Sequence, residues 1–405
     1  MWRSTTRLGH TVTAPSAPSA TCTGRLRPAR GRRRSPPLAH WRAGFKVVSV
    51  VLVFGRKKTQ PNEVEHGRVR TRQYLMHPRM LYTTARQTAA AASDVTSKEF
   101  ILKLPRGAYT TARTVGRSSV FELETHLERL AISAQLMMDD DAAKAAPTAG
   151  ATPAPPMTVD AVLLRQDVLA SVRAAIVSHA ERSACELKVT VLATWTAAAG
   201  AAGAAGATGA AGAAAEGETA ASANFEVHTH VGDLVPRRAP PVCVVVRGSP
   251  RENARAKDSD WIRQRQGLED EKPAHVDEVV MMAEDGGLPE GTQTNFFAVK
   301  GGTLFTAGDG VLEGTVRRVV LEVCERDGIP VELVPPNVAD VMAWEGAFVS
   351  STSRLVLPID EIEVPRGQFA GMPEGAKRKF EGRSLVHQIE DKVMAEIESH
   401  SLSVM

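Results

Sequence analysis

The sequence predicts a mixed α/β protein with two domains, because strand-like and helix-like segments alternate along much of its 405 residues. Short β-branched runs, such as Glu186–Trp195 and Val242–Val246, are typical of strands. From Leu123 to Ala134, apolar residues recur every three or four positions, which indicates a helix with one buried face. Val235–Pro241 is rich in proline and arginine and is typical of a linker between domains.

Residues 1–97 are predicted to be a leader that precedes the folded part. No Asp or Glu occurs before Glu63, whereas 13 of the chain's 49 Lys and Arg residues do. An Arg-, Ser- and Ala-rich segment without acids is typical of a transit peptide for a chloroplast or mitochondrion. The alternatives are a disordered basic leader, a mistaken upstream start codon, or a nuclear signal at Gly31–Ser35. We therefore expect an organelle protein, and otherwise a cytoplasmic one.

Charge, hydropathy and cysteine spacing argue against several classes of protein. Beyond residue 62 the chain has 36 basic and 46 acidic residues, so no nucleic-acid partner is expected. Val47–Phe54 is much shorter than the ~20 apolar residues of a membrane span, so no membrane partner is expected either. The cysteines show no CxxC spacing, which argues against a zinc site or disulfide framework and favours a reducing compartment. They are Cys22, Cys185, Cys243 and Cys324.

The first domain is predicted to cover residues 98–236 and to combine a sheet with two helices. One helix begins near Glu122 and a second is capped by Thr158, and a flexible loop over residues 139–157 joins them. Residues 197–221 form a Gly/Ala-rich insertion whose GxxGxxG pattern lacks the strand–turn–helix context of a phosphate loop. The predicted strands are Phe100–Leu104, Gly107–Val115, Val120–Phe121, Glu186–Trp195 and Phe225–His230.

Two histidines in the last of these strands raise the question of a metal. His228 and His230 point to one face, because alternate residues of a strand share a face. Such a pair can bind a metal ion, but no third ligand is visible nearby. We therefore favour a polar strand face and predict no metal site.

The second domain is predicted to cover residues 240–400. Its helices are Trp261–Glu269, capped by Ser259 or Asp260, a helix that follows Val311–Arg317 and stops at Gly328, and Leu385–Ile397. Its predicted strands are Val242–Val246, three short strands of a β-meander between Val276 and Thr306, Pro330–Val334 and Gly346–Val349.

The second domain also carries residue types that suit a pyridoxal 5'-phosphate cofactor. A lysine must bind its aldehyde, an acid must keep its ring nitrogen protonated, and an anion site must bind its phosphate. Lys257 is the candidate lysine, and Glu290, 33 residues later, is the candidate acid. Taken singly, each would more often be an ordinary residue, a solvated lysine in a basic loop or a carboxylate in a turn.

The candidate phosphate site combines a helix start, a strand end and an arginine. Gly314 and Thr315 lie at a predicted helix N-terminus, where free N–H groups and the helix dipole favour an anion. Ser351 and Thr352 follow a strand and add hydroxyl and amide donors. Arg129 can add a charged, directional donor.

Five segments in this order resemble the fold-type IV, or class IV, pyridoxal-phosphate enzymes. This family includes branched-chain aminotransferases, D-amino-acid aminotransferases and aminodeoxychorismate lyases. The segments are HLERL (His126–Leu130), Lys257, EGTQTNFFAV (Glu290–Val299), LEGTVR (Leu312–Arg317) and SSTSRLVLPI (Ser350–Ile359).

The resemblance implies a role for each candidate residue. Lys257 corresponds to the lysine that forms the Schiff base, and Glu290 to the glutamate on the pyridine nitrogen. The remaining implied cofactor contacts, chiefly to the phosphate, are Arg129, Asn295, Gly314, Thr315, Val316, Ser351 and Thr352.

The resemblance also implies a fold and partners. We expect a small domain of sheet and helices, a larger domain with a barrel-like β core and flanking helices, and the cofactor in the cleft between them. A homodimer is expected, in which the second copy closes the site. The implied partners are an amino acid and a 2-oxo acid.

Several departures from the family pattern leave the reaction open. Val316 stands where the family has threonine, and Ile262 replaces the tyrosine of branched-chain aminotransferases. The R-x-H pattern of D-amino-acid aminotransferases is absent, and KDSDWIRQRQ, from Lys257, is unlike the lyase segment KxxN. We predict an aminotransferase. The alternatives are a lyase that makes 4-aminobenzoate from aminodeoxychorismate, and a non-catalytic cofactor-binding protein.

Overall fold

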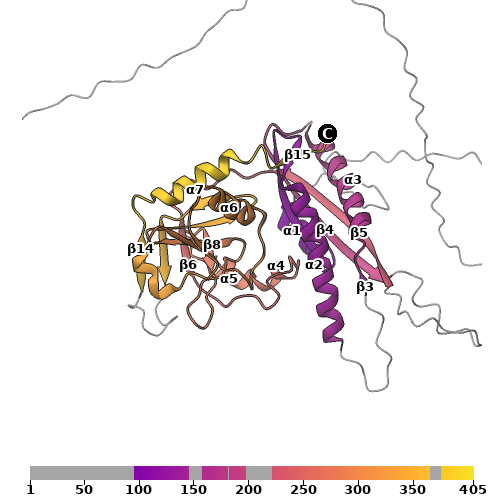
Figure 1. Cartoon of the computed structure of the whole chain (residues 1–405). Coiled ribbons are helices and arrows are strands. Elements are labelled where there is room, and N and C mark those ends of the chain that lie inside the picture. Colours follow the sequence, from indigo (N-terminus) through magenta and orange to yellow (C-terminus); the bar gives the residue numbers. More distant parts are fainter. Residues whose placement is uncertain (1–94, 146–156, 181, 198–220, 365–374) are drawn as a thin grey trace, which may run out of the picture. The chain divides into compact units, whose positions relative to one another are not determined.

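The computed structural model describes residues 95–145, 157–180, 182–197, 221–364 and 375–405, which form three sheets with helices packed on them (Figure 1). The predicted mixed α/β class is confirmed. Nearly all of the predicted leader, most of the loop over 139–157 and nearly all of the Gly/Ala insertion lie outside the described residues. Within the described segments, no helix is both long and apolar enough to cross a membrane. The domain limits, 98–236 and 240–400, stay predictions.

A six-stranded sheet contains most of the strands predicted for the first domain. Its strand order is β15-β2-β1-β4-β5-β3. β4 and β5 form a long antiparallel hairpin, paired from Leu187 with Asp233 to Ala197 with Ala223, so the Gly/Ala insertion falls between two paired strands. The strands are β1 (Ala108–Val115), β2 (Ser119–Phe121), β3 (Met157–Thr158), β4 (Leu187–Ala197), β5 (Ala221–Asp233) and β15 (Ser401–Ser403).

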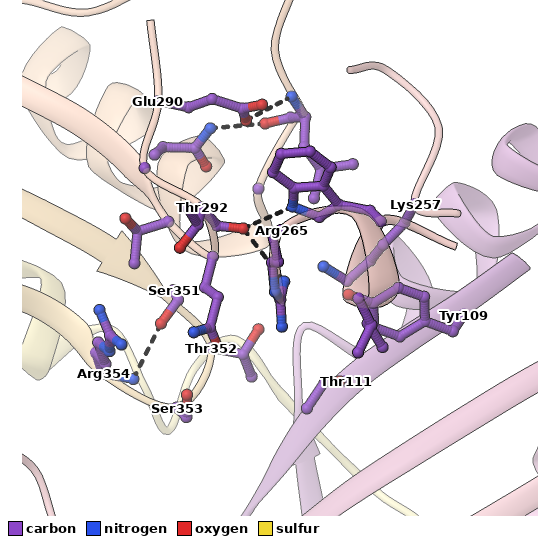
Figure 2. Close-up of a pocket in the computed structure, with 18 of the residues that line it drawn as sticks. Tyr109, Thr111, Lys257, Arg265, Glu290, Thr292, Ser351, Thr352, Ser353 and Arg354 are labelled. Carbon is purple, nitrogen blue, oxygen red and sulfur yellow. Dashed lines mark hydrogen bonds between the residues drawn. The ribbon is translucent and has the colours of Figure 1, made fainter. Parts of the chain in front are cut away.

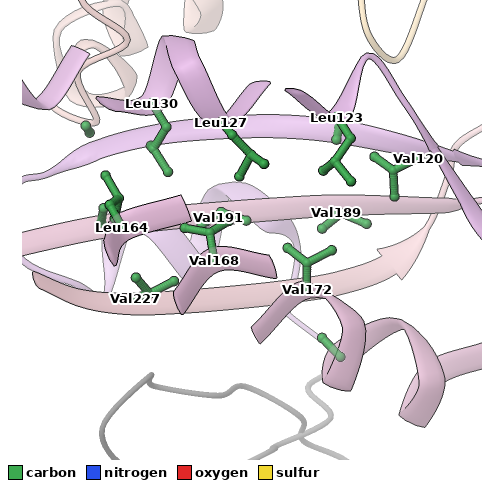
Figure 3. Close-up of a cluster of buried hydrophobic side chains, with 14 of the residues drawn as sticks. Val120, Leu123, Leu127, Leu130, Leu164, Val168, Val172, Val189, Val191 and Val227 are labelled. Atoms are coloured by element: carbon green, nitrogen blue, oxygen red, sulfur yellow. The ribbon is translucent and has the colours of Figure 1, made fainter. Parts of the chain in front are cut away.

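Two long helices pack with this sheet around one hydrophobic core. They are α2 (Leu123–Lys144) and α3 (Ala161–Ala180). Leu127 and Leu130 of α2 and Val168 of α3 lie in one cluster with Val191 of β4 (Figure 3). The apolar repeats seen in the sequence therefore face the sheet. α2 extends six residues, Asp139–Lys144, into the segment that was predicted to be a loop.

Two local predictions in this region are wrong. Phe100–Leu104 is not a strand, since its first three residues end the helix α1 (Ser97–Leu102), which a capping box of Thr96 and Glu99 starts. Thr158 does not cap α3, since it lies in β3. Asp160 does so instead: its Oδ1 accepts hydrogen bonds from the amides of Val162 and Leu163, both at 3.0 Å.

The other two sheets pack around a second core. Their strand orders are β10-β9-β8-β11-β12 and β14-β13-β6-β7. Val244 of β6, Phe296 of β8 and Ala347 of β11 share one hydrophobic cluster. The strands are β6 (Cys243–Val246), β7 (Glu278–Val280), β8 (Asn295–Lys300), β9 (Thr303–Phe305), β10 (Val331–Glu332), β11 (Gly346–Ser351), β12 (Leu355–Pro358), β13 (Glu361–Val364) and β14 (Ala376–Lys379).

The predicted three-stranded meander is only partly correct. β8 and β9 form an antiparallel hairpin, whose turn uses Gly301 and Gly302 at positive φ. β7 instead pairs in parallel with β6, in the other sheet. Both β6 and β7 are mostly buried apolar runs, which is the composition of parallel strands covered on both faces.

The helices of the second part position the site. They are α4 (Trp261–Gln264), α5 (Gln266–Asp270), α6 (Thr315–Arg326), the 3-10 helix η1 (Val338–Ala343) and α7 (Ser384–Ala395). The predicted helix Trp261–Glu269 is thus two short helices. Neither predicted cap acts there: Asp260 makes no capping hydrogen bond, and Ser259 Oγ instead accepts from the amide of Gly107 at 3.0 Å.

Candidate active site

One cavity of about 280 Å³ brings together every residue that the sequence predicted for the site. Figure 2 shows four of them, Lys257, Glu290, Ser351 and Thr352. Its walls come from β1, β4, α2, the segment before α4, the loop that precedes β8, the start of α6 and the end of β11. The predicted residues that line it are Lys257, Arg129, Glu290, Asn295, Gly314, Thr315, Val316, Ser351 and Thr352.

The backbone of Lys257 is held by two elements of the six-stranded sheet region. Its amide donates to Ser133 Oγ on α2 at 3.1 Å, and its carbonyl accepts from the amide of Tyr109 on β1 at 2.9 Å. The side chain enters the cavity, with Nζ 4.7 Å from the centre of the Tyr109 ring (Figure 2). The amine is therefore presented from a fixed backbone.

The electrostatic surroundings favour the neutral form of this amine. The pKa of Lys257 is lowered well below its ordinary value, and burial is the largest cause. The positive charges of Arg129, Arg251 and Arg265 lower the pKa further, and the negative charge of Glu290 opposes them. Since a neutral amine is the nucleophilic form, the site prepares Lys257 to attack an aldehyde.

Glu290 is buried on the same cavity and is held through both carboxylate oxygens. Oε1 accepts from Nε of Arg251 at 2.8 Å, and Oε2 accepts from the amide of Leu312 at 3.2 Å. Burial raises the pKa of Glu290, whereas the charge and hydrogen bond of Arg251 lower it. The guanidinium of Arg251 also lies over the ring of Trp261, 5.4 Å from its centre. Arg251 is thus a site residue that the sequence reasoning missed.

The start of α6 offers an anion site made largely of backbone. Gly314 is the N-cap, and the first amides of the helix, at Thr315 and Val316, have no partner within the helix. A Cβ atom at Gly314 would lie 2.1 Å from Oδ1 of Asn295, so only glycine fits there. Asn295 is itself fixed, since its Nδ2 donates to the carbonyl of Leu312 at 2.7 Å.

The structure explains how Val316 can stand where the family has threonine. The side chain of Val316 belongs to the buried cluster of α6, α7 and β11, so it faces the core. One place earlier, Thr315 Oγ1 lies 3.3 Å from Thr352 Oγ1 on the cavity wall. The cavity thus retains hydroxyl groups from Thr315 and Thr352 together with the first amides of α6.

Arg129 is a buried cation without a counterion. Its NH1 donates to the carbonyl of Glu313 at 3.2 Å and its NH2 to Thr110 Oγ1 at 3.0 Å, but Nε has no partner. Among the described residues no carboxylate pairs with it, and burial lowers its pKa to about 10. A buried guanidinium of this kind is stabilised by an anionic ligand.

Four further cations line the cavity and were not predicted, and one of them, Lys98, pairs with Glu269 at 3.2 Å. We call Lys188, Arg265 and Arg354 the cationic group. Arg265 pairs with Glu269 at 2.7 Å, and Arg354 pairs with Glu278 at 2.5 Å. Lys188 has no acidic partner within the described segments. Its pKa is lowered by burial first and then by the charges of Arg265 and Arg354.

The two histidines of β5 are buried and do not form an evident metal site. His230 Nε2 lies 3.0 Å from the carbonyl oxygen of Val95, and burial lowers the pKa of both His228 and His230. In the part of the chain that the structure describes, no three potential ligands from His, Cys, Asp and Glu cluster together.

Comparison with known protein families agrees with this geometry. The family model of amino-transferase class IV matches residues 107–362. The chain belongs to the class IV aminotransferases. The family predicted from the five sequence segments is therefore confirmed.

Individual class IV relatives match part of their own length. A putative branched-chain-amino-acid aminotransferase of Methanocaldococcus jannaschii is 30% identical over 112 residues, 26% of this chain and 39% of that protein. A D-alanine aminotransferase of Staphylococcus epidermidis is 30% identical over 107 residues, 25% of this chain and 38% of that protein. The aligned segments thus span about two fifths of these curated relatives.

Solved class IV structures share the fold. A branched-chain aminotransferase from Thermoproteus uzoniensis, crystallised with norvaline, is similar with a TM-score of 0.55 and 20% identity, over 80% of this chain and 99% of that one. A hypothetical aminotransferase from Mycobacterium tuberculosis, in its PLP-bound form, gives 0.53 and 18%, over 79% and 99%. The predicted fold type is confirmed.

The described residues fit pyridoxal phosphate. The uncompensated charge of Arg129 and the helix start at Gly314 suit its phosphate dianion. The amine of Lys257 suits its aldehyde, and the buried carboxylate of Glu290 suits its ring nitrogen.

Proposed function

We propose that this chain is a pyridoxal-phosphate-dependent aminotransferase, which moves an amino group between an amino acid and a 2-oxo acid. One observation supports the proposal most directly. Lys257, with its lowered pKa, and the buried carboxylate of Glu290 line the same cavity as Arg129, a buried cation without a carboxylate partner among the described residues. Membership of class IV supports it. Pyridoxal phosphate, when bound, supplies an aldehyde that amines attack and a ring that accepts electrons.

Lys257 would serve both as the anchor and as the base of the reaction. Its neutral Nζ binds the aldehyde and, once displaced by the substrate amine, can take the proton from the substrate's α-carbon. The bonds of its backbone to Ser133 and Tyr109 keep the side chain in one orientation during both roles. A lowered pKa suits a base that must be neutral near physiological pH.

The remaining predicted residues would orient the cofactor. Arg129, Thr352 and the amides of Thr315 and Val316 would bind the phosphate. Glu290 would pair with the protonated ring nitrogen, and Arg251, through Glu290 Oε1, would keep this carboxylate ionised and in place.

The cationic group would bind the substrate's carboxylate. Every amino acid and 2-oxo acid carries at least one carboxylate, which needs a donor in the cavity. Lys188 has no acidic partner among the described residues, while Arg265 and Arg354 each keep one, so a negative charge is favoured beside Lys188.

A panel of L- and D-amino acids tests the proposed reaction. The purified protein should bind added pyridoxal phosphate and turn yellow, and a reactive amino acid should convert the bound cofactor to its amine form. A colourless protein that ignores added cofactor would overturn the proposal. Pyruvate release from aminodeoxychorismate without an amino acceptor would identify the lyase, and cofactor binding with no half-reaction would identify a non-catalytic protein.

Two further parts of the proposal concern assembly and location. We propose a homodimer, as the family resemblance implies, and light scattering would measure its mass. We also propose import into a chloroplast or mitochondrion, which the acid-free, Arg-rich leader supports. Residues 1–97 fused to a fluorescent protein would show the compartment, and a diffuse cytoplasmic signal would contradict import.

A further inference from the structure

One carboxylate outside the cavity is bound by donors from three segments of the chain. Oε1 of Glu122 accepts from Arg318 NH2 at 2.6 Å and lies 2.7 Å from His400 Nδ1. Its Oε2 accepts from Thr125 Oγ1 at 2.7 Å and from Nε of Arg318 at 3.0 Å. The side chain of Glu122 is only 3% exposed and that of Arg318 is 50% exposed, so these charge-assisted bonds join a buried carboxylate to a half-exposed guanidinium.

Two of these segments build the phosphate site. Glu122 immediately precedes α2, which carries Arg129. Arg318 lies in the first turn of α6, whose first amides line the cavity. His400 immediately precedes β15, which pairs with β2 beside the start of α2. The carboxylate therefore joins the helix that carries the guanidinium to the helix that carries the amides.

The backbone of Glu122 is held in an unusual conformation by the same neighbours. Its φ of 55° and ψ of 35° are left-handed, a conformation that residues other than glycine rarely adopt. Its amide donates to the carbonyl of His400 at 2.8 Å, and its carbonyl accepts from the amide of His126 at 3.0 Å. Both the backbone and the side chain of Glu122 are thus tied to His400.

We propose that Glu122, Arg318 and His400 form a positioning clamp, which fixes Arg129 relative to the start of α6 and so sets the affinity for the cofactor's phosphate. Within the described residues, the only other direct hydrogen bond between α2 and the start of α6 is the one from Arg129 to the carbonyl of Glu313, at 3.2 Å. The clamp touches neither substrate nor cofactor, since none of its three residues lines the cavity. The inference rests on the proposed function, because it requires that this site bind pyridoxal phosphate.

The phosphate group itself provides the test. Apo-protein is titrated with pyridoxal 5'-phosphate and, separately, with pyridoxal, which has the aldehyde but no phosphate. Glu122→Gln and Arg318→Met should weaken binding of the phosphorylated form about tenfold and leave pyridoxal binding unchanged. Lys300→Met, which removes an exposed ion pair with Asp340, is the matched control and should change neither.

The other outcomes contradict either the clamp alone or the clamp together with the proposed function. Equal weakening for both ligands, or no change for either, would overturn the clamp while leaving the proposed function intact. A wild-type protein that binds neither ligand would overturn the proposed function and the clamp together. Should Glu122→Gln fail to fold, Arg318→Met provides the same comparison, because it changes the half-exposed partner of the pair; an unchanged phosphate preference in that variant would overturn the clamp.

Discussion

The phosphate-binding wall and the cationic group solve the problem of binding an anion in different ways. The first uses backbone amides at Thr315 and Val316 and a guanidinium, Arg129, that has no carboxylate partner among the described residues. In the second, Arg265 and Arg354 are already paired with carboxylates of the chain. A backbone site fits one fixed ligand, whereas paired side chains can exchange partners. We therefore expect cofactor binding to be rigid and substrate binding to be adjustable.

The largest expected effect comes from Lys257, which serves both parts of the site. Lys257→Ala should abolish the yellow colour of bound cofactor and reduce kcat by about 10³-fold, since positioned acid–base catalysis alone contributes about 10²–10⁴-fold. Absorbance spectra and transamination rates measure the two effects. A variant that keeps both its colour and its rate would show that another amine carries the reaction.

The second largest effect is expected from changes in the phosphate-binding wall, which should lower the affinity for the cofactor. Arg129→Met removes a charged hydrogen-bond donor worth about 1.5–3 kcal/mol, so cofactor affinity should fall about 10- to 100-fold. Gly314→Ala should have a similar effect, because the added methyl group would collide with Asn295. Titration of the apo-protein measures affinity, and unchanged affinity in both variants would exclude this wall as the phosphate site.

The cationic group should affect the substrate and not the cofactor. Lys188→Met should raise the KM for the 2-oxo acid by about 3- to 10-fold, because Arg265 and Arg354 still face the carboxylate and only about 1 kcal/mol, the contribution of an ordinary hydrogen bond, is lost. Cofactor affinity should stay the same. Steady-state kinetics measure the KM, and a titration of the apo-protein measures the cofactor affinity. A fall in cofactor affinity would contradict the separate roles of the phosphate-binding wall and the cationic group.

A last expected effect concerns the stability of the apo-protein and not its catalysis. Burial lowers the pKa of Lys257, so protonation favours the unfolded state, and apo-protein stability should rise with pH from the lowered pKa up to about 10.4. Lys257→Met removes this cost, which is about 1.4 kcal/mol for each unit of pKa shift. Thermal unfolding at pH 7 should show a more stable variant, and the gain should vanish above the ordinary lysine pKa.

The residues of the cofactor site could be predicted from the sequence, whereas those of the cationic group could not. Lys257, Glu290 and Gly314 lie in segments with fixed spacing and a shared family pattern, so their convergence on one cavity was predictable. Lys188 is the only charged residue of its strand, and Arg354 lies in a turn. Nothing in the local pattern of either residue shows which cavity it faces, because that depends on how the sheets are placed.

The same physical limit explains the errors in the fold. Helical repeats predicted α2, α3 and α6, since they report a single buried face. Strand pairing is not local, so the parallel partner of β7 could not be read from its own residues. α1 was missed for the opposite reason: its apolar run resembled a strand, while the capping box at Thr96 decided the local structure.

The pairing of β15 with β2 has a consequence for the order of folding. Val120 pairs with Leu402, about 280 residues later in the chain, and the amide of Val404 donates to the carbonyl of Ser118 at 3.0 Å. At about 5–20 residues per second, ribosomes need tens of seconds to make the intervening segment. During that time β2 is an open sheet edge, to which another chain can add a strand. Nascent chains of this protein should therefore depend on chaperones that cover β2 until Ser401–Ser403 emerge.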